Sequence, residues 1–319
     1  MAFDELGADP SKQTTQKYTV GATGVVSRTL SLWKQHFVQY TIIVGIIGAA
    51  TIMVSFIILF TLFGIIGVMG TDPILYLVSI LFFTSLPNLT LILVSLLFAS
   101  VVFAINAILG GAAIKFALDD YSARGADIRT SLSHSYGKIL NFIAVQLAIS
   151  FLVSILLYPG LFLVTNVIGI IDISDPYNPI FPTGSIEMLM AGSVLFLVGG
   201  LFMIYISARL APAPAIVIDT NLSAIDSLKK SWAITSGNVL HVIGSRLVFG
   251  IAVIVLGLLA DAFAYLLGYV NPVFDSFYLV IESILIALLF WALNYIFPVV
   301  LYRDLSSRVK ESSLDELMI

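Results

Sequence analysis

Two acidic side chains interrupt apolar stretches that are long enough to cross a lipid bilayer, and they are the residues best placed for chemistry inside a membrane. Asp261 and Glu282 each lie within such a stretch. On an insertion scale, an aspartate at mid-helix costs about 2.5–3.5 kcal/mol, so it requires a compensating environment. One hypothesis is an ion- or proton-linked site that faces the interior of a helix bundle. The other, simpler interpretation is a pair of carboxylates that are hydrogen-bonded near the outer surface.

A second group of polar residues surrounds one short connection between apolar stretches. Asp219 follows a helix end that contains two prolines, and a predicted amphipathic helix comes next. This helix either lies in the headgroup region of the membrane or packs its apolar stripe on the ends of the other helices, and both interpretations stay open. The candidate interfacial residues are Arg209, Asp219, Lys229, Lys230 and Trp232, and the apolar stripe is Ile225, Leu228 and Trp232.

The rest of the sequence carries little recognisable chemistry. The patterns HExxH, GxSxG and GxxxxGK[ST] are absent, and so is cysteine. The three histidines, His36, His134 and His241, lie one in each predicted linker, and only their convergence would make a metal or proton site. We expect them to be polar residues of the membrane interface. The sequence therefore predicts no catalytic residue, cofactor or metal ion.

The composition requires a membrane to surround these residues. The chain is 59% apolar and 11% charged, whereas a soluble domain carries about 25% charged residues. All fifteen lysines and arginines fall within residues 12–34, 115–138, 209–246 and 303–310. If the long apolar stretches cross the bilayer, these segments lie on one side, as the positive-inside rule requires. We therefore expect a multi-pass protein of the cell membrane with both termini in the cytoplasm.

The hydropathy pattern predicts an all-α integral membrane fold with six transmembrane helices, because a crossing needs about 20 apolar residues. A proline at position 87 divides one long uncharged run, which gives an additional outer helix at 74–85 before the second crossing. The predicted crossings are 38–68, 88–117, 139–170, 187–211, 239–269 and 274–302.

An internal repeat organises these crossings. At an offset of 100 residues, 118–147 matches 218–247, with Asp119 on Asp219 and Gly137 on Gly237. The predicted unit is an amphipathic linker helix, a glycine and a crossing. Units with an even number of crossings repeat in the same orientation, which predicts parallel repeats. The expected organisation is a disordered cytoplasmic tail at 1–20, hairpins at 21–118, 119–218 and 219–305, and a weakly ordered acidic cytoplasmic tail at 306–319.

The segment 209–238 carries a pattern of its own: an arginine and prolines at a helix end, an acid, then Ala-Ile-Asp-Ser-Leu-Lys-Lys-Ser-Trp, then Thr-Ser-Gly-Asn. It resembles a group of uncharacterised polytopic membrane proteins that includes the membrane domain of some bacterial glycerophosphodiester phosphodiesterases. The resemblance implies a six-crossing bundle with cytoplasmic amphipathic linkers. It implies no chemistry here, because little sequence follows the last predicted crossing and the catalytic domain of those enzymes is missing.

These features predict a non-enzymatic membrane module: a scaffold, regulator or accessory subunit that acts through its basic interfacial linkers. The expected partners are a bilayer with an anionic inner leaflet and a protein partner or a second copy of the chain. Nucleic acid is not expected, because the basic residues are scattered over several segments. The alternative is a transporter or lipid-handling protein with a cavity between hairpins, in which Asp261 and Glu282 would act.

Overall fold

The computed structural model describes residues 20–45, 48–49, 52, 89–170, 184–270 and 278–317. The predicted tail at 1–20, most of the first crossing at 38–68 and the outer helix at 74–85 lie outside these residues. The described chain is helical, with short turns between helices. The helices are α1 (Ala22–Gln35), α2 (Phe37–Tyr40), the π-helix η2 (Thr41–Gly45), α5 (Leu89–Tyr121), α6 (Ile128–Ile170), α7 (Ser185–Leu210), α8 (Ala213–Asp219), α9 (Ala224–Ile234), α10 (Val239–Val270), α12 (Tyr278–Phe290) and α13 (Leu293–Leu317).

Four candidate membrane spans occur within the described residues. They are Ile128–Val167, Ser185–Asp219, Val239–Leu267 and Val280–Val309, and each is long and apolar enough to cross a bilayer. This result confirms the helical class for the described residues, and the four candidate spans are compatible with a membrane protein. Helix α5 also begins and ends close to the predicted second crossing at 88–117.

Two predicted boundaries are wrong. The linker at 128–138 and the crossing predicted from 139 form one continuous helix, α6, and Gly137 is helical within it. The equivalent Gly237 has a φ of 77° in a turn between α9 and α10. The turn forms because the Thr235 hydroxyl bonds back to the carbonyls of α9, including that of Ser231 at 2.9 Å. The corresponding Ser135 instead donates to the Ile108 carbonyl of α5, at 2.7 Å.

The last predicted crossing, 274–302, also differs. It is divided into α12 and α13 by a turn at Trp291 and Ala292. Helix α13 then continues to Leu317 with Pro298 inside it. The backbone of residues 306–317 is therefore a continuation of the helix, where we expected a weakly ordered tail.

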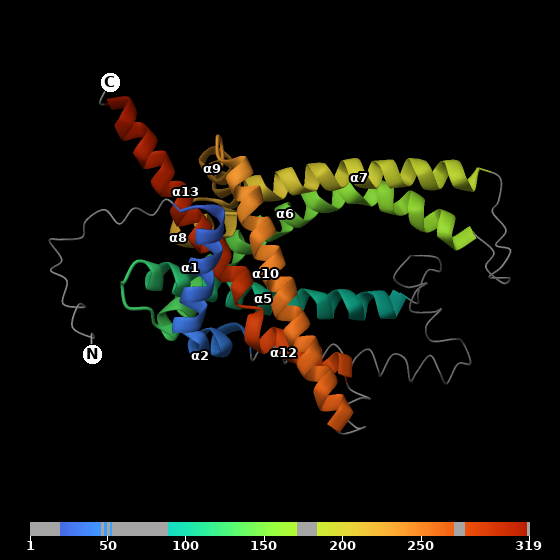
Figure 1. Cartoon of the computed structure of the whole chain (residues 1–319), viewed down its shortest axis with the longest axis horizontal. Coiled ribbons are helices and arrows are strands. Elements are labelled where there is room, and N and C mark those ends of the chain that lie inside the picture. The colour runs from blue at the N-terminus through green and yellow to red at the C-terminus, as the bar shows by residue number, and fades with distance from the viewer. Residues whose placement is uncertain are drawn as a thin grey trace.

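Helices α6 and α7 lie side by side along most of their length, while α10 crosses at an angle and packs on α12 (Figure 1). The contact between α6 and α7 depends on glycine. A Cβ atom at Gly199 would lie 2.1 Å from the Leu156 carbonyl oxygen, and one at Gly160 would lie 2.3 Å from the Phe196 nitrogen. Small residues permit such close backbone approach between membrane helices, where polar packing and dispersion replace the hydrophobic effect.

The core lies at the opposite end of this hairpin, around the short helix α8. All residues from Ala213 to Ile218 are buried, and none of them is charged. Helices α5, α6, α9 and α13 pack on α8, and Figure 1 shows them gathered at the end of the molecule where α1 lies. This packing places the end of α8, with its polar residues, among several helices.

Two neighbouring glycines test the α6–α7 contact. Gly199→Ala should lower the stability of the protein by about 1–3 kcal/mol, because the added methyl group meets backbone that has no room to move. Gly200→Ala is the matched control, since a Cβ atom there has nothing within 4 Å, and its better helix propensity should leave stability unchanged or slightly higher. Thermal unfolding in detergent, followed by circular dichroism, measures both. Equal stability of the two variants would contradict the close contact.

The expected orientation is tested by single cysteines, because the natural chain has none. Glu187→Cys and Tyr269→Cys should react with an impermeant thiol reagent in intact cells, since both lie at outer helix ends under the positive-inside rule. Arg124→Cys and Lys229→Cys should react only after permeabilisation. All four native side chains are exposed, so accessibility within the protein does not limit the reaction. Labelling of Lys229→Cys in intact cells would reverse the expected topology.

Candidate functional site

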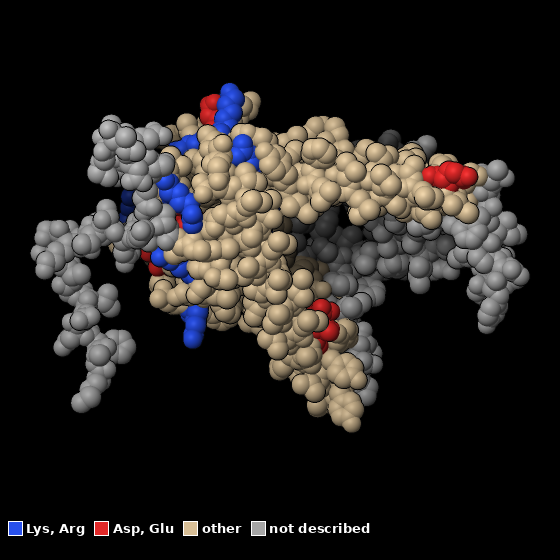
Figure 2. Space-filling view, turned by 45° about the horizontal axis from the view of Figure 1, so that its top comes forward, with Lys and Arg blue, Asp and Glu red and all other residues tan. Residues whose placement is uncertain are grey.

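Charge is distributed unequally along the helices. The lysine and arginine atoms visible in Figure 2 gather at the end where α1, α9 and α13 lie, whereas the far ends of α7 and α10 show acidic and apolar atoms. Helix α7 illustrates this polarity, with Glu187 in its first turn and Arg209 in its last turn. The basic end is therefore the part of the described chain in which polar side chains concentrate.

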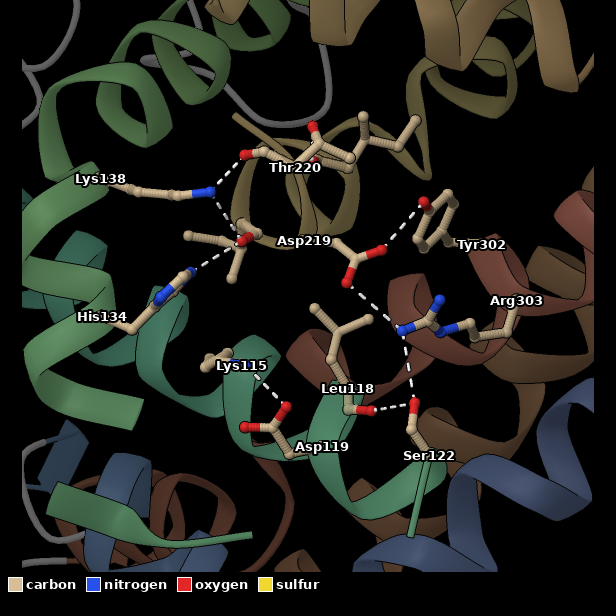
Figure 3. A network of polar contacts seen from close by, with 12 residues as sticks. Lys115, Leu118, Asp119, Ser122, His134, Lys138, Asp219, Thr220, Tyr302 and Arg303 are labelled. Atoms are coloured by element: carbon tan, nitrogen blue, oxygen red, sulfur yellow. Dashed lines mark hydrogen bonds and ion pairs between the residues drawn. The ribbon is translucent and has the colours of Figure 1, made fainter. Parts of the chain in front are cut away.

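Asp219 lies at the centre of a polar network at this end (Figure 3). Its carboxylate accepts a hydrogen bond from the Tyr302 hydroxyl at 3.1 Å and pairs with Arg303 at 3.4 Å. The Arg303 guanidinium also donates to the Ser122 hydroxyl at 3.4 Å, and that hydroxyl donates to the Leu118 carbonyl at 2.7 Å. Arg303 thus joins α13 to the ends of both α8 and α5.

The main chain at the end of α8 is held from the other side by α6. The His134 Nε2 atom lies 3.0 Å from the Ile218 carbonyl oxygen, so this nitrogen donates. The Lys138 ammonium donates to the same carbonyl at 3.2 Å and also to the Thr220 carbonyl. The last carbonyls of a helix lack intrahelical donors and carry partial negative charge, so cations stabilise them.

The local sequence explains why α8 ends here. Pro212 stands before its first residue and Pro214 in its first turn, where a missing N–H is tolerated. The buried apolar residues that follow end at Asp219, whose neighbour Thr220 has an extended backbone with φ −119° and ψ 168°. A turn at Ala211 and Pro212 thus divides α7, which ends at Leu210, from α8.

The two remaining histidines make similar contacts. The His36 Nδ1 atom lies 3.0 Å from the Asp120 carboxylate at the end of α5, and the His241 Nε2 atom lies 2.8 Å from the Asp304 carboxylate in α13. Each histidine therefore contacts a different helix: α5, α8 or α13. The separation along the chain is 84 residues both for His36 with Asp120 and for His134 with Ile218. This shared spacing is a signal that sequence reasoning missed.

Asp304 is the most enclosed of these acids, with no exposed surface. Besides His241, it accepts from the backbone N–H of Val20 at 2.8 Å and from the Arg308 guanidinium at 3.0 Å. Arg308 in turn donates to the Val20 carbonyl at 2.6 Å. The start of α1 is thus fixed to α13 through a buried carboxylate whose charge is fully hydrogen-bonded.

Helix α9 packs only part of the predicted apolar stripe on the protein. Its buried residues are Ser227, Ser231 and Ile234, and Leu228 of the stripe is partly buried against the core, whereas Ile225 and Trp232 are 64% and 40% exposed. The reason is close approach, since the small Ser231 side chain reaches the Arg209 carbonyl at 2.7 Å. The exposed apolar side chains favour the headgroup interpretation over packing of the stripe on other helices.

The remaining interfacial candidates lie around this helix. Arg209 is 7% exposed, and its guanidinium carbon lies 4.3 Å from the Trp232 ring centre. Lys229 is exposed, with its ammonium 3.9 Å from the Asp226 carboxylate, and Lys230 is half-buried. Asp219 is not part of this group, because its partners belong to α13. The structure therefore divides the predicted motif into two clusters.

Asp261 and Glu282 lie on helices that pack against each other, α10 and α12. Both side chains are half-buried. The structure shows neither a hydrogen bond nor an ion pair for them among the described residues. Their placement is compatible with each of the two interpretations that the sequence allows.

The three histidines have separate partners and do not converge. Among the described residues, no three or more histidine, cysteine, aspartate or glutamate side chains form a group that could hold an ion. An open depression of about 440 Å³ lies beside the network, lined by Arg129, Thr130, Ser133 and His134. At its edge, hydrogen bonds from the Thr130 backbone and hydroxyl lower the pKa of Asp127.

Comparison of the chain with models of known protein families, with curated proteins and with solved structures found no match. The resemblance of residues 209–238 to the membrane domain of phosphodiesterases stays a prediction.

The Asp219–Arg303 pair should stabilise the protein measurably. Asp219→Asn should lower the free energy of unfolding by roughly 1.5–3 kcal/mol, because a charge-assisted hydrogen bond is lost between side chains that are only about a fifth exposed. Lys229→Gln is the control, because its ion pair is exposed and contributes roughly 0–1 kcal/mol. Thermal or denaturant unfolding in detergent measures both.

A double-mutant cycle with Arg303→Gln separates the pair from other effects of each substitution. The double variant should be less destabilised than the sum of the two single variants. Strict additivity would show that Asp219 and Arg303 stabilise the protein independently.

Proposed function

We propose that this chain is a non-enzymatic multi-pass protein of the cell membrane, a scaffold, regulator or accessory subunit that acts through its basic inner end. The observation that carries the proposal is the surface of α9. Lys229 and Trp232 lie one turn apart on the exposed side of this helix, and Ile225 is exposed beside them. A basic and aromatic surface with apolar side chains suits the headgroup region of an anionic leaflet.

The proposed topology has six crossings in three parallel hairpins, with cytoplasmic linkers and both termini in the cytoplasm. The four candidate spans and the location of lysine and arginine at one end support it. The histidine contacts add further support. His134 and His241 each contact the last part of their own proposed hairpin, at Ile218 and Asp304, and His36 contacts Asp120, two residues beyond the end of its own.

A non-enzymatic role is supported by the way in which the polar groups are used. Asp219, Arg303, His134 and Lys138 contact one another's helices and the ends of main chain. Such contacts join elements together, and they occupy the donors and acceptors that a general acid or base would need. The proposed partners are anionic lipids of the inner leaflet and a protein, or a second copy of this chain, that contacts the basic end.

Removal of the α9 charges tests this proposal. Lys229→Gln/Lys230→Gln should leave the folded yield intact, since neither side chain is buried. It should weaken binding of an anionic phospholipid by about 1 kcal/mol per charge, roughly fivefold each. The measurement is a titration of the detergent-solubilised protein with phosphatidylglycerol, with phosphatidylcholine as the neutral lipid. Glu187→Gln is the control at the opposite end of α7. Unchanged lipid binding, or loss of folding, would exclude an interfacial role for this pair.

The alternative function is transport or lipid handling through a cavity between hairpins. It is supported by the half-buried acids Asp261 and Glu282 on the two packed helices α10 and α12. If the protein is a proton-linked transporter, vesicles that contain it should acidify inside when a pH gradient is applied, and a trapped pH-sensitive dye measures this change. The flux would be abolished by Asp261→Asn or Glu282→Gln and retained by Lys229→Gln/Lys230→Gln.

A further inference from the structure

Arg209 is buried without a counter-charge. Only 7% of its surface is exposed, and its Nε atom is buried with no hydrogen-bond partner in the described structure. None of the described carboxylates lies within ion-pair distance of it. A buried guanidinium with an unsatisfied Nε–H is unfavourable unless an anion or an acceptor compensates it. The site is therefore incomplete with the protein groups alone.

The neighbouring groups stabilise the positive charge but do not satisfy its N–H donors. The Trp232 ring lies 4.3 Å from the guanidinium carbon, and the Tyr205 ring lies 5.9 Å from it. These contacts are cation–π interactions with the ring faces. Arg209 is also in the last turn of α7, where the helix dipole favours a cation. A planar guanidinium leaves several donors in a fork that matches two oxygens of a phosphate or carboxylate.

A second cation lies on the same side of α9 as Trp232. Lys229 precedes Trp232 by three residues, about one helical turn, and both side chains are exposed. The Tyr205 and Trp232 rings meet edge to face at 6.0 Å. Two cations beside two aromatic rings at the basic end of a membrane helix are typical of the headgroup level, where tryptophan and tyrosine concentrate.

An apolar surface leads from this point along α7. Leu197, Leu201, Tyr205 and Arg209 are spaced four residues apart. They form a row that turns around the helix by about 40° at each step, from the exposed leucines to the buried Arg209. The exposed fractions of Leu197, Leu201 and Tyr205 are 67%, 69% and 41%. A chain of hydrocarbon lying along this row would end at the guanidinium of Arg209.

We propose that Arg209 and Lys229 bind the phosphate of an inner-leaflet phospholipid, with its acyl chain along Leu197 and Leu201. Arg209 donates to two phosphate oxygens, and Lys229 supplies a second positive charge from the solvent side. The rings of Trp232 and Tyr205 enclose the headgroup. The inference rests on the proposed function, in which the basic end attracts anionic lipids in general. It adds a defined binding site for one phospholipid at that end.

The test uses the full chain, delipidated in mild detergent, and the variant Arg209→Met. Phosphatidylglycerol, phosphatidylcholine and inorganic phosphate are added separately, and the unfolding temperature and the lipid affinity are measured. The wild-type protein should be stabilised most by phosphatidylglycerol, and Arg209→Met should lose this stabilisation. Its affinity should fall roughly tenfold or more, as for removal of a buried partner of a charged ligand. In the absence of lipid, Arg209→Met should be as stable as the wild type, because an unpaired buried charge has been removed.

Several results would overturn the site. One is a full response of Arg209→Met to phosphatidylglycerol. Another is a wild-type response to inorganic phosphate as large as that to phosphatidylglycerol, which would indicate a free-anion site. The third is a wild-type response to phosphatidylcholine as large as that to phosphatidylglycerol. A lipid-independent loss of stability in Arg209→Met would indicate a purely structural arginine. If Arg209→Met does not fold, Lys229→Gln provides the same comparison on an exposed residue.

Arg124→Gln is the matched control, because Arg124 is an exposed arginine at the same basic end. It should retain the wild-type response. If Arg124→Gln and Lys229→Gln reduce the affinity equally, the general attraction of the basic end holds and the local site fails. If the wild-type protein shows no preference for the anionic lipid, the lipid-binding part of the proposed function fails with it.

Discussion

The basic end of this protein depends on how the last carbonyls of α8 are hydrogen-bonded inside the molecule. The apolar residues of α8 are fully buried, so its last carbonyls have no access to water and require donors from protein. Lys138 and His134 of α6 supply them. The helix then ends in Asp219, a negative charge at the negative end of a helix dipole, which is unfavourable unless a cation compensates it. Arg303 of α13 is that cation.

This arrangement fixes three helices relative to one another. Because the donors come from α6 and the cation from α13, burial of α8 determines where both helices lie, and Ser122 adds the end of α5. The sequence indicated that Asp219 follows a proline break, and it repeated the acid at Asp119. It did not indicate the partners, which lie more than 80 residues away along the chain. Pairing over such separations is decided by packing, and local periodicity carries no information about it.

The predictions were most successful where a single rule decides the outcome. Long apolar runs became helices, and the prolines at 212 and 214 separated α7 from α8. They were least successful where two rules compete. The stripe of Ile225, Leu228 and Trp232 was compatible with packing on the protein and with the headgroup region. Only Leu228 packs on the core, while small Ser227 and Ser231 are buried. In a membrane, small residues mark close packing, and large apolar residues are equally stable toward lipid.

Gly137 and Gly237 illustrate the same limit. They align in sequence, yet one continues a helix and the other ends a turn with positive φ. The difference arises from neighbours, since Thr235 bonds to its own helix while Ser135 bonds to α5. Likewise, the packing of α10 on α12 follows from a short connection along the chain. The environment of Asp261 and Glu282 also depends on which other helices lie beside these two, and local sequence patterns do not specify that.

The continuity of α6 has a mechanical consequence. A helix of 43 residues is roughly 65 Å long at 1.5 Å per residue, about twice the hydrocarbon thickness of a bilayer. Its first turns carry His134 and Lys138 to the end of α8, and its last turns lie beside α7. Pro159 lies inside α6 and is a point at which a helix bends, so a change in bilayer thickness that alters the tilt of the segment before Pro159 also displaces the donors in its first turns. The part of α6 before Pro159 therefore joins the close contact with α7 at Leu156 to the polar contacts at the end of α8.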